Sequence, residues 1–229
     1  MTETLIGSAS ASAAPTIGEI SLADDPGSWE ALGFTIAGGA VQLGAVRLTL
    51  AGSDAGRGII GWSLRGATSR ELDGLPTAPS DLAAPTPAPQ HPNGVIAIDH
   101  VVAMSPQLDR SILALRSAGL DLRRIREQPT PAGAPRQAFF RLGAVILEVV
   151  QEPTEVIDQR STGANGPARF WGIALLASDL DRTVAHLAEY TSEIRPAVQP
   201  GRRIATLRRT AGLAVPIALM SRTEGPKET

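Results

Sequence analysis

The sequence predicts an α+β protein built from repeated units with the element order β-α-β-β-β. The first observation behind this prediction is a duplicated segment, since residues 95–150 and 168–221 show the same succession of elements. The second is its spacing: Leu108-Asp109-Arg110 and Leu180-Asp181-Arg182 lie 72 positions apart (180 − 108), an offset that holds without a gap from His100 to Leu122. A repeat of about this length indicates a duplicated structural unit.

In the first repeat, residues 94–104 are rich in Val and Ile and predict a buried strand. Ser105 and Pro106 are typical of a helix start, as cap and first helical position, and Gly119 is typical of a helix end. The three remaining strands of this unit are expected at 120–125, 136–142 and 144–151.

The second repeat predicts the same order, with a first strand at 169–176 and a helix capped by Ser178 or Asp179. Its other strands are expected near 193–198, 202–208 and 213–221. The N-terminal segment reads as a degenerate third copy, because GAVQLGAVRLTLAG (39–52) resembles LGAVILEVV (142–150). Residues 57–66 supply one more strand there.

Two shifts in composition divide the chain. Residues 76–93 carry six prolines and predict a stiff linker, and 153–167 end in a string of turn formers. The predicted organisation is a flexible tail (1–15), a degenerate N-terminal βαβββ-like unit (16–75), the proline-rich linker (76–93), a βαβββ unit (94–152), a linker (153–167), a βαβββ unit (168–222) and a tail (223–229).

The bulk composition is that of a folded protein: 229 residues, 43% hydrophobic, 19% charged, with a net charge of −2. This balance gives no reason to expect nucleic acid or a membrane surface as a partner. No apolar run approaches the ~18–20 residues of a transmembrane helix. With no cysteine and no basic segment typical of a signal peptide, a cytoplasmic protein without disulfides or thiolate chemistry is predicted.

The paired units resemble the vicinal oxygen chelate superfamily, which includes glyoxalase I, methylmalonyl-CoA epimerase, extradiol dioxygenases and bleomycin resistance proteins. The resemblance lies in Ile98-Asp99-His100-Val101-Val102, in the Leu108-Asp109-Arg110 helix, and in Phe139-Phe140-Arg141-Leu142-Gly143 with the strand that follows. It implies a glyoxalase-like fold, in which repeated units form a bowl-shaped mixed sheet. It does not specify the reaction, because fold alone does not determine function.

The resemblance also implies a divalent metal held by side chains on the first and last strands of each unit. Carried over by position, His100 and Glu148 match these ligand places, and an imidazole with a carboxylate suits Zn²⁺, Ni²⁺, Mn²⁺ or Fe²⁺. The second repeat has Gly172 and Ala218 at the matching places, and the N-terminal copy has Thr49 in place of the glutamate. Three protein ligands are the usual minimum. The third could be Glu19, Glu152, His91 or His186, and no spacing selects among them.

Each of these residues also has a structural interpretation. His100 could be a core or partner-bonded histidine, and Glu148 could form an internal ion pair with Arg141 or Arg136. His186 is expected on a helix surface, and His91, in the proline-rich linker, is expected to be solvated.

Arginines are the other candidates for ligand binding, because a guanidinium grips a carboxylate or phosphate at two points. Arg136 and Arg141 flank a strand of the first repeat, and Arg202, Arg203, Arg208 and Arg209 crowd the matching strand of the second. We take Arg136, Arg141, Arg203 and Arg208 as candidate substrate-binding residues, with pairing to the chain's acids as the alternative. Trp171 and Phe139 are candidates for contact with a flat or apolar ligand, or for core packing.

Two functions follow from these residues. One is a metal-dependent lyase, isomerase or dioxygenase acting on a small oxygenated molecule, with Glu148 and His100 as catalytic residues. The other is a metal-free protein that binds or sequesters a small molecule, as bleomycin resistance proteins do. A third unit without a partner would leave an unpaired sheet edge, so homodimerisation through residues 16–75 is also predicted.

Overall fold

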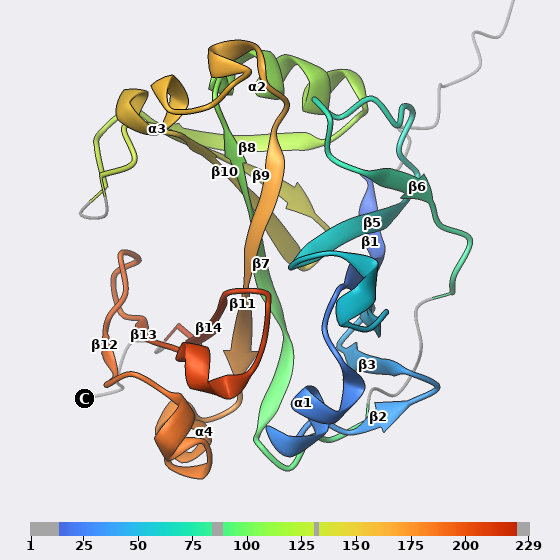
Figure 1. Ribbon diagram of the computed structural model, residues 1–229, viewed down its shortest axis with the longest axis vertical. Coiled ribbons are helices and arrows are strands. Elements are labelled where there is room, and N and C mark those ends of the chain that lie inside the picture. Colours follow the sequence, from blue (N-terminus) through green and yellow to red (C-terminus); the bar gives the residue numbers. More distant parts are fainter. Residues whose placement is uncertain (1–13, 84–88, 131–132, 224–229) are drawn as a thin grey trace, which may run out of the picture.

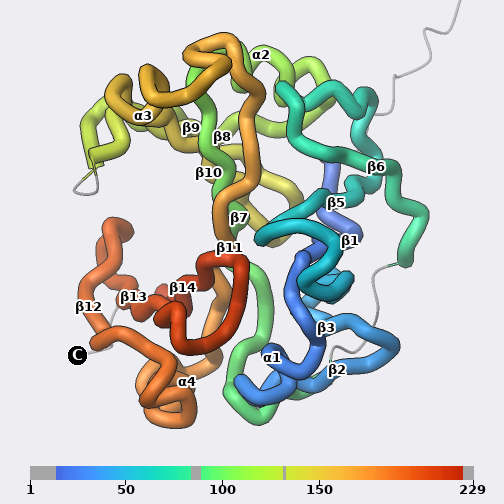
Figure 2. The backbone as a smooth tube through the Cα atoms, viewed as in Figure 1, coloured from blue at the N-terminus to red at the C-terminus, as the bar shows by residue number. Residues whose placement is uncertain are grey.

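The computed structural model describes residues 14–83, 89–130 and 133–223, and it consists of two mixed β-sheets with short helices around them (Figures 1 and 2). The α+β class is therefore confirmed. The tails predicted at 1–15 and 223–229 fall almost entirely outside the described residues. Within the described part of the chain, no helix is long and apolar enough to cross a membrane.

Three segments have the βαβββ order. The N-terminal one consists of β1 (Thr16–Leu22), α1 (Pro26–Ala31), β2 (Ile36–Ala37), β3 (Ala40–Leu43) and β4 (Val46–Leu50). The middle one consists of β7 (Val95–Ser105), α2 (Leu108–Ser117), β8 (Asp121–Arg126), β9 (Gln137–Leu142) and β10 (Val145–Gln151). The C-terminal one consists of β11 (Arg169–Ala177), α4 (Leu180–His186), β12 (Arg195–Pro196), β13 (Arg203–Thr206) and β14 (Ile217–Met220).

All three segments share one sheet topology, in which the first strand pairs in parallel with the last. The strand orders are β2-β3-β4-β1, β8-β9-β10-β7 and β12-β13-β14-β11. The middle and C-terminal segments join through the antiparallel pair β7–β11, which runs through the centre of the molecule and makes one eight-stranded sheet (Figure 1). The short helix α3 (Thr154–Asp158) lies in the connection between these two segments.

The N-terminal sheet has two further strands, β5 (Ile59–Arg65) and β6 (Thr77–Pro79). β5 pairs antiparallel with β1, as β11 does with β7, and β6 pairs in parallel with β5, as β14 does with β11. The unit predicted at 16–75 thus contains a complete βαβββ segment and β5, the equivalent of the first strand of a fourth segment; β6, the equivalent of its last strand, lies beyond residue 75 in the predicted linker. β5 occupies the edge of β1 that the sequence left unpaired, so the dimer prediction loses this argument and stays a prediction.

The proline-rich stretch 76–93 contains two ordered features. β6 lies at the edge of its sheet, the position that a strand with flanking prolines tolerates. His91, expected to be solvated, is buried: its Nδ1 accepts from the Thr35 amide at 3.1 Å and its Nε2 lies 2.9 Å from the Gln42 carbonyl oxygen. The expectation for His91 was wrong because the sequence did not show that this histidine binds the backbone on both sides of the β2–β3 hairpin, at Thr35 and at Gln42.

One apolar cluster unites both sheets. It includes Trp29 on α1 and Phe140 on β9, both fully buried. Trp62 on β5 meets Phe170 on β11 with ring centroids 5.0 Å apart, so the two sheets pack directly on each other. Since a shared core couples the elements that contribute to it, the two halves form one structural body.

Candidate functional site

A cavity of about 290 Å³ lies on one face of the eight-stranded sheet. Alternation along β7 and β10 creates this face: Val101 and Leu147 point into the core, whereas His100 and Glu148 line the cavity. The C-terminal segment contributes through the β12–β13 connection, which brings Arg202 to the cavity wall. The site is therefore built by two units of the repeat.

Sheet register explains how His100 and Glu148 come together. β10 runs parallel to β7 with Ile146 opposite His100 and Glu148 opposite Val102, so the two polar side chains are diagonal neighbours on one face. His100 Nε2 lies 3.5 Å from Glu148 Oε2, and each side chain is 15% exposed. The pairing places an imidazole and a carboxyl group together at the floor of the cavity.

Asp99 orients His100 from the side. Its Oδ2 lies 2.8 Å from His100 Nδ1, and its Oδ1 accepts from Arg202 Nη2 at 2.6 Å. Burial alone would raise the pKa of Asp99, but the hydrogen bonds from His100 and Arg202 hold it below its usual value. Asp99 is thus an anion at neutral pH, and it fixes both the imidazole and the Arg202 guanidinium.

Glu148 has the opposite electrostatic balance. Burial raises the pKa of this carboxyl group above its usual value, while the nearby His100 and a hydrogen bond from Gln137 Nε2 oppose that shift only in part. A carboxyl group with a raised pKa is a better proton acceptor when ionised than an ordinary surface glutamate. The interpretation of Glu148 as an ion pair with Arg136 or Arg141 was wrong, since its contacts are His100 and Gln137.

The cavity wall is rich in arginine. Arg123 and Arg124 reach it from β8, and the Arg124 guanidinium lies 4.8 Å from the centroid of the Phe139 ring. A row of register partners crosses the sheet here and consists of Arg124, Phe139, Glu148 and Val102. Phe139 is the one predicted contact residue, besides the His100–Glu148 pair, that lines the cavity.

The other predicted contact residues lie outside the cavity lining. Arg136 forms a fork with Asp109 (3.1 Å for both nitrogens) and also binds Glu127. Arg203 forms the corresponding fork with Asp181 at 2.9 and 2.6 Å. Asp109 and Asp181, the aspartates of the two Leu-Asp-Arg motifs, therefore link each helix to the third strand of its unit. Arg136 and Arg203 thus pair with acidic residues, the alternative given for them in the sequence analysis.

Arg141, Arg208 and Trp171 are exposed at the surface. Arg141 donates to the Gly143 carbonyl oxygen at 3.5 Å, and the Trp171 side chain is 49% exposed. The roles assigned to these residues from the sequence stay predictions, and the geometry brings none of them to the His100–Glu148 pair.

Sequence reasoning missed Asp99, Arg123 and Arg124 as parts of the site, and it named Arg202 among the candidate arginines without selecting it. Asp99 could have been found, because a carboxylate inside a Val/Ile strand breaks the pattern as Glu148 does. The arginines could not be selected, because β8 has an irregular register at residues 122–124 and both of its neighbouring arginines reach the cavity.

The residues present do not fit a metal held by protein side chains alone. His100 and Glu148 supply two ligands, and the register equivalents of this pair in the C-terminal unit are Gly172 and Ala218, with Ala218 opposite Ala174 on β11. A β-carbon on Gly172 would lie 2.7 Å from the backbone oxygen of the residue opposite, Pro216, so no side chain fits there. Among the described residues, no cluster of three or more His, Asp or Glu side chains could hold a metal.

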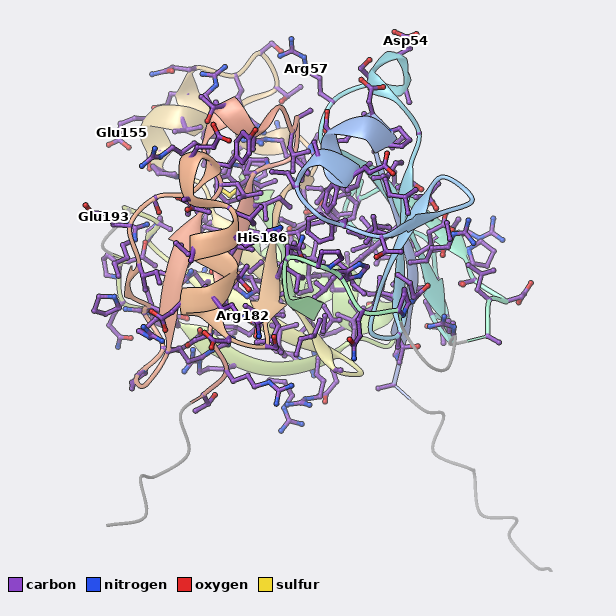
Figure 3. All side chains as sticks on the ribbon, turned by 90° about the horizontal axis from the view of Figure 1, so that it is seen from below. Asp54, Arg57, Glu155, Arg182, His186 and Glu193 are labelled. Atoms are coloured by element: carbon purple, nitrogen blue, oxygen red, sulfur yellow. The ribbon has the colours of Figure 1, made fainter. Side chains whose placement is uncertain are left out.

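The four candidates for a third ligand lie in other settings. Glu152 is fully buried and pairs with Arg160 and Arg169 at 3.2 and 2.8 Å. His91 closes the β2–β3 hairpin, and Glu19 lies on β1, 3.7 Å from Arg47, in the other sheet. His186 is exposed on α4, as expected (Figure 3).

Comparisons with known proteins support the fold. No family model matches the chain, and no curated protein matches it. Among solved structures, a xylose isomerase-like TIM barrel/4-hydroxyphenylpyruvate dioxygenase fusion protein has 14% identity and a TM-score of 0.61, covering 96% of this chain and 51% of that one. This chain therefore spans about half the length of the fusion protein.

Two epimerase structures match a smaller part. Methylmalonyl-CoA epimerase from Mycobacterium tuberculosis has 18% identity and a TM-score of 0.46, covering 57% of this chain and 91% of that one. A variant of Streptomyces coelicolor methylmalonyl-CoA epimerase, in complex with 2-nitronate-propionyl-CoA, has 20% identity and a TM-score of 0.45, covering 58% and 99%.

The architecture of repeated βαβββ units is the glyoxalase-like fold. The chain has the fold of the vicinal oxygen chelate superfamily, as its sequence predicts.

Proposed function

We propose that this glyoxalase-like protein binds a small organic anion in the cavity of its eight-stranded sheet, without a metal held by protein side chains. The observation that carries the proposal is the convergence of three arginines, Arg123, Arg124 and Arg202, on a floor formed by His100 and Glu148. A guanidinium binds a carboxylate or phosphate at two points and suits a ligand of that charge.

The charge of the cavity supports an anionic ligand. Arg202 is neutralised in part by Asp99, and Arg123 by Asp121 at the surface. Arg124 instead stacks on Phe139. Among the residues that line the cavity, three arginines face two carboxyl groups, Asp99 and Glu148, so the wall retains a positive excess even when Glu148 is ionised. A volume of about 290 Å³ suits a small ligand rather than a large one.

The His100–Glu148 pair gives this binding site a chemical capacity. Asp99 holds the His100 ring by Nδ1, so that Nε2 faces Glu148 and the cavity. A ligand with an acidic hydroxyl or an acidic C–H bond next to its carboxylate would meet a proton acceptor there. The same pair would also hydrogen-bond a ligand that the protein only sequesters.

A metal-dependent lyase, isomerase or dioxygenase is the second candidate. It is favoured by the contact of His100 Nδ1 with a carboxylate, an arrangement common for metal-bound histidines, and by the 3.5 Å between His100 Nε2 and Glu148 Oε2. Zn²⁺, Ni²⁺, Mn²⁺ or Fe²⁺ would then need ligands beyond the two that the chain offers.

Calorimetric titration with benzoate, its neutral analogue benzamide and inorganic phosphate tests the proposal, with and without EDTA. We expect benzoate or phosphate to bind, benzamide to bind at least about tenfold more weakly than benzoate, and EDTA to have no effect. Arg202→Gln is expected to weaken anion binding about tenfold or more, whereas the control Arg57→Gln, at an exposed arginine outside the cavity lining, leaves it unchanged.

Binding of neither anion, or equal affinity in the Arg202→Gln protein, would overturn the proposal. Binding that disappears in EDTA and returns with one of the four metals would establish the second candidate instead. The cytoplasmic location and the homodimer through residues 16–75 also stay proposals, and light scattering of the full chain tests the latter.

A further inference from the structure

A second cavity, of about 340 Å³, lies between the two sheets. Two copies of one tetrapeptide form much of its wall: Leu-Gly-Ala-Val at 43–46, in the β3–β4 turn, and Leu-Gly-Ala-Val at 142–145, in the β9–β10 turn. The repeated turn that the sequence shows in the N-terminal and middle units thus meets its own copy across this space.

The two turns keep the cavity open. Gly44 and Gly143 have φ angles of 58° and 69°, a left-handed conformation that glycine adopts without strain. A β-carbon on Gly143 would lie 3.1 Å from Thr16 Cγ2, so the turn packs closely against β1. The residue after each glycine is alanine, and its small side chain leaves the space unfilled.

Arg65 is the one charged residue among those lining this cavity. It extends from the end of β5, where its Nη1 donates to the Ile17 carbonyl oxygen at 2.8 Å and its Nε donates to that of Leu82. Its Nη2 is buried and has no hydrogen-bond acceptor among the described residues, where no carboxylate pairs with this guanidinium either. A buried cationic group without an acceptor is costly, and an anion in the cavity would remove that cost.

We propose that the cavity between the sheets is a second binding site, for an organic anion with an apolar body, whose carboxylate pairs with Arg65. The inference goes beyond the function proposed for the first cavity. An apolar space of roughly 150 Å³ holds benzene, so one of about 340 Å³ suits a medium-length alkyl chain or a two-ring body. The two cavity linings have one residue in common, Ala144, and no charged residue in common. Ligands in the two sites are therefore expected to bind independently.

The experiment is a calorimetric titration of the full chain with octanoate and with 1-octanol, which share the alkyl chain and differ in charge. Because the first cavity is itself proposed to bind carboxylates through Arg202, the titrations use the Arg202→Gln protein, in which we expect octanoate to bind with about one equivalent per chain and 1-octanol to bind at least about tenfold more weakly. Arg65→Gln is expected to reduce octanoate binding to the level of 1-octanol. Arg57→Gln in the same background, at an exposed arginine outside both cavity linings, serves as the matched control and leaves octanoate binding unchanged.

A second variant covers the case in which Arg65→Gln fails to fold, because Arg65 also binds two backbone carbonyls. Ala45→Trp places a large side chain on an exposed turn residue of the wall and is expected to abolish binding of both probes while the melting temperature is retained. Octanoate binding to the Arg202→Gln protein that survives the addition of Arg65→Gln or Ala45→Trp, or the absence of octanoate binding to the Arg202→Gln protein, would overturn the inference.

Discussion

At the scale of single residues, the site depends on two carboxyl groups with opposite electrostatic surroundings. Asp99 receives hydrogen bonds from His100 and Arg202, which keep its pKa low despite burial. Glu148 is buried with weaker compensation, so its pKa is raised. The pair Asp99–His100 is therefore the fixed part of the site, and Glu148 is the group whose charge responds to pH and to a ligand.

The raised pKa of Glu148 predicts how the stability of the fold depends on pH. The folded protein holds this proton more tightly than the unfolded chain, so Glu148 stabilises the fold below its ordinary pKa of 4.5, and that contribution is lost as pH rises through the folded-state pKa. Glu148→Gln cannot ionise. Its melting temperature, relative to the parent, is expected to rise as pH increases from about 4 to about 8 in scanning fluorimetry.

The matched control is Glu127→Gln, because the hydrogen bond from Arg136 lowers the pKa of that exposed carboxyl group. Its ionised form favours the folded state above the ordinary pKa, so the substitution is expected to have the opposite sign and a small effect. Parallel pH profiles for the two variants would contradict the electrostatic account of Glu148.

At the scale of elements, the pair β5–β6 repeats the pair β11–β14 in detail. Gly61 and Gly172 occupy equivalent places on β5 and β11, and each is followed by an amide that donates to a proline carbonyl oxygen, Trp62 to Pro76 at 3.1 Å and Ile173 to Pro216 at 3.0 Å. The glycine and the proline facing each other explain why the metal-ligand place of the C-terminal unit holds no side chain.

Substitution of the two glycines tests this equivalence. A β-carbon on Gly172 would lie 2.7 Å from the Pro216 oxygen, and one on Gly61 would lie 3.4 Å from the Pro76 oxygen. We therefore expect Gly172→Ala to lower the free energy of unfolding by about 1–3 kcal/mol, as for an overpacked site, and Gly61→Ala to lower it by less. Urea unfolding measures both, and an equal or smaller loss for Gly172→Ala would refute the steric account.

Helix starts show how far local sequence signals reach. Asp179 caps α4 as predicted, since its side chain accepts from the Arg182 amide at 3.1 Å. For α2, the prediction was off by two residues: the helix begins at Leu108, and Ser105 instead accepts from the Gln107 amide at 3.0 Å within the preceding turn. The tertiary contact of Ser105 with Ser111 on α2 decides its role.

At the scale of the whole molecule, the two sheets share one core, in which Trp62 and Phe170 meet. Trp62 is 3% exposed and its Nε1 donates to Thr77 Oγ1 at 2.8 Å, so it also anchors β6. The two halves are therefore expected to unfold together. The unfolding curves of the parent protein from circular dichroism and from tryptophan fluorescence should then coincide.

Trp62→Ala is expected to lower the free energy of unfolding by about 3–5 kcal/mol, the range for truncation of a buried aromatic side chain. The control is Trp171→Ala, which removes a side chain that is 49% exposed and is expected to cost less than about 1 kcal/mol. Two separate transitions in the parent, or equal losses in the two variants, would mean that the sheets are not coupled through this contact.

The repeat, the order of elements within the middle and C-terminal units, and the fold class could all be predicted from the sequence alone. Spacing along the chain carries that information, because duplicated units repeat their apolar patterns and turn residues. The resemblance to the vicinal oxygen chelate superfamily also grouped His100 and Glu148 as candidates for one site, and in the structure the two side chains are neighbours.

The charged groups that surround this pair could be identified only from the three-dimensional arrangement of the chain. Arg202 reaches Asp99 from 103 positions away, and Arg136 and Arg203 turn instead to the aspartates of the Leu-Asp-Arg helices. Sequence patterns cannot resolve such choices, because adjacent arginines are chemically identical and their roles follow from register, strand irregularities and the packing of distant turns.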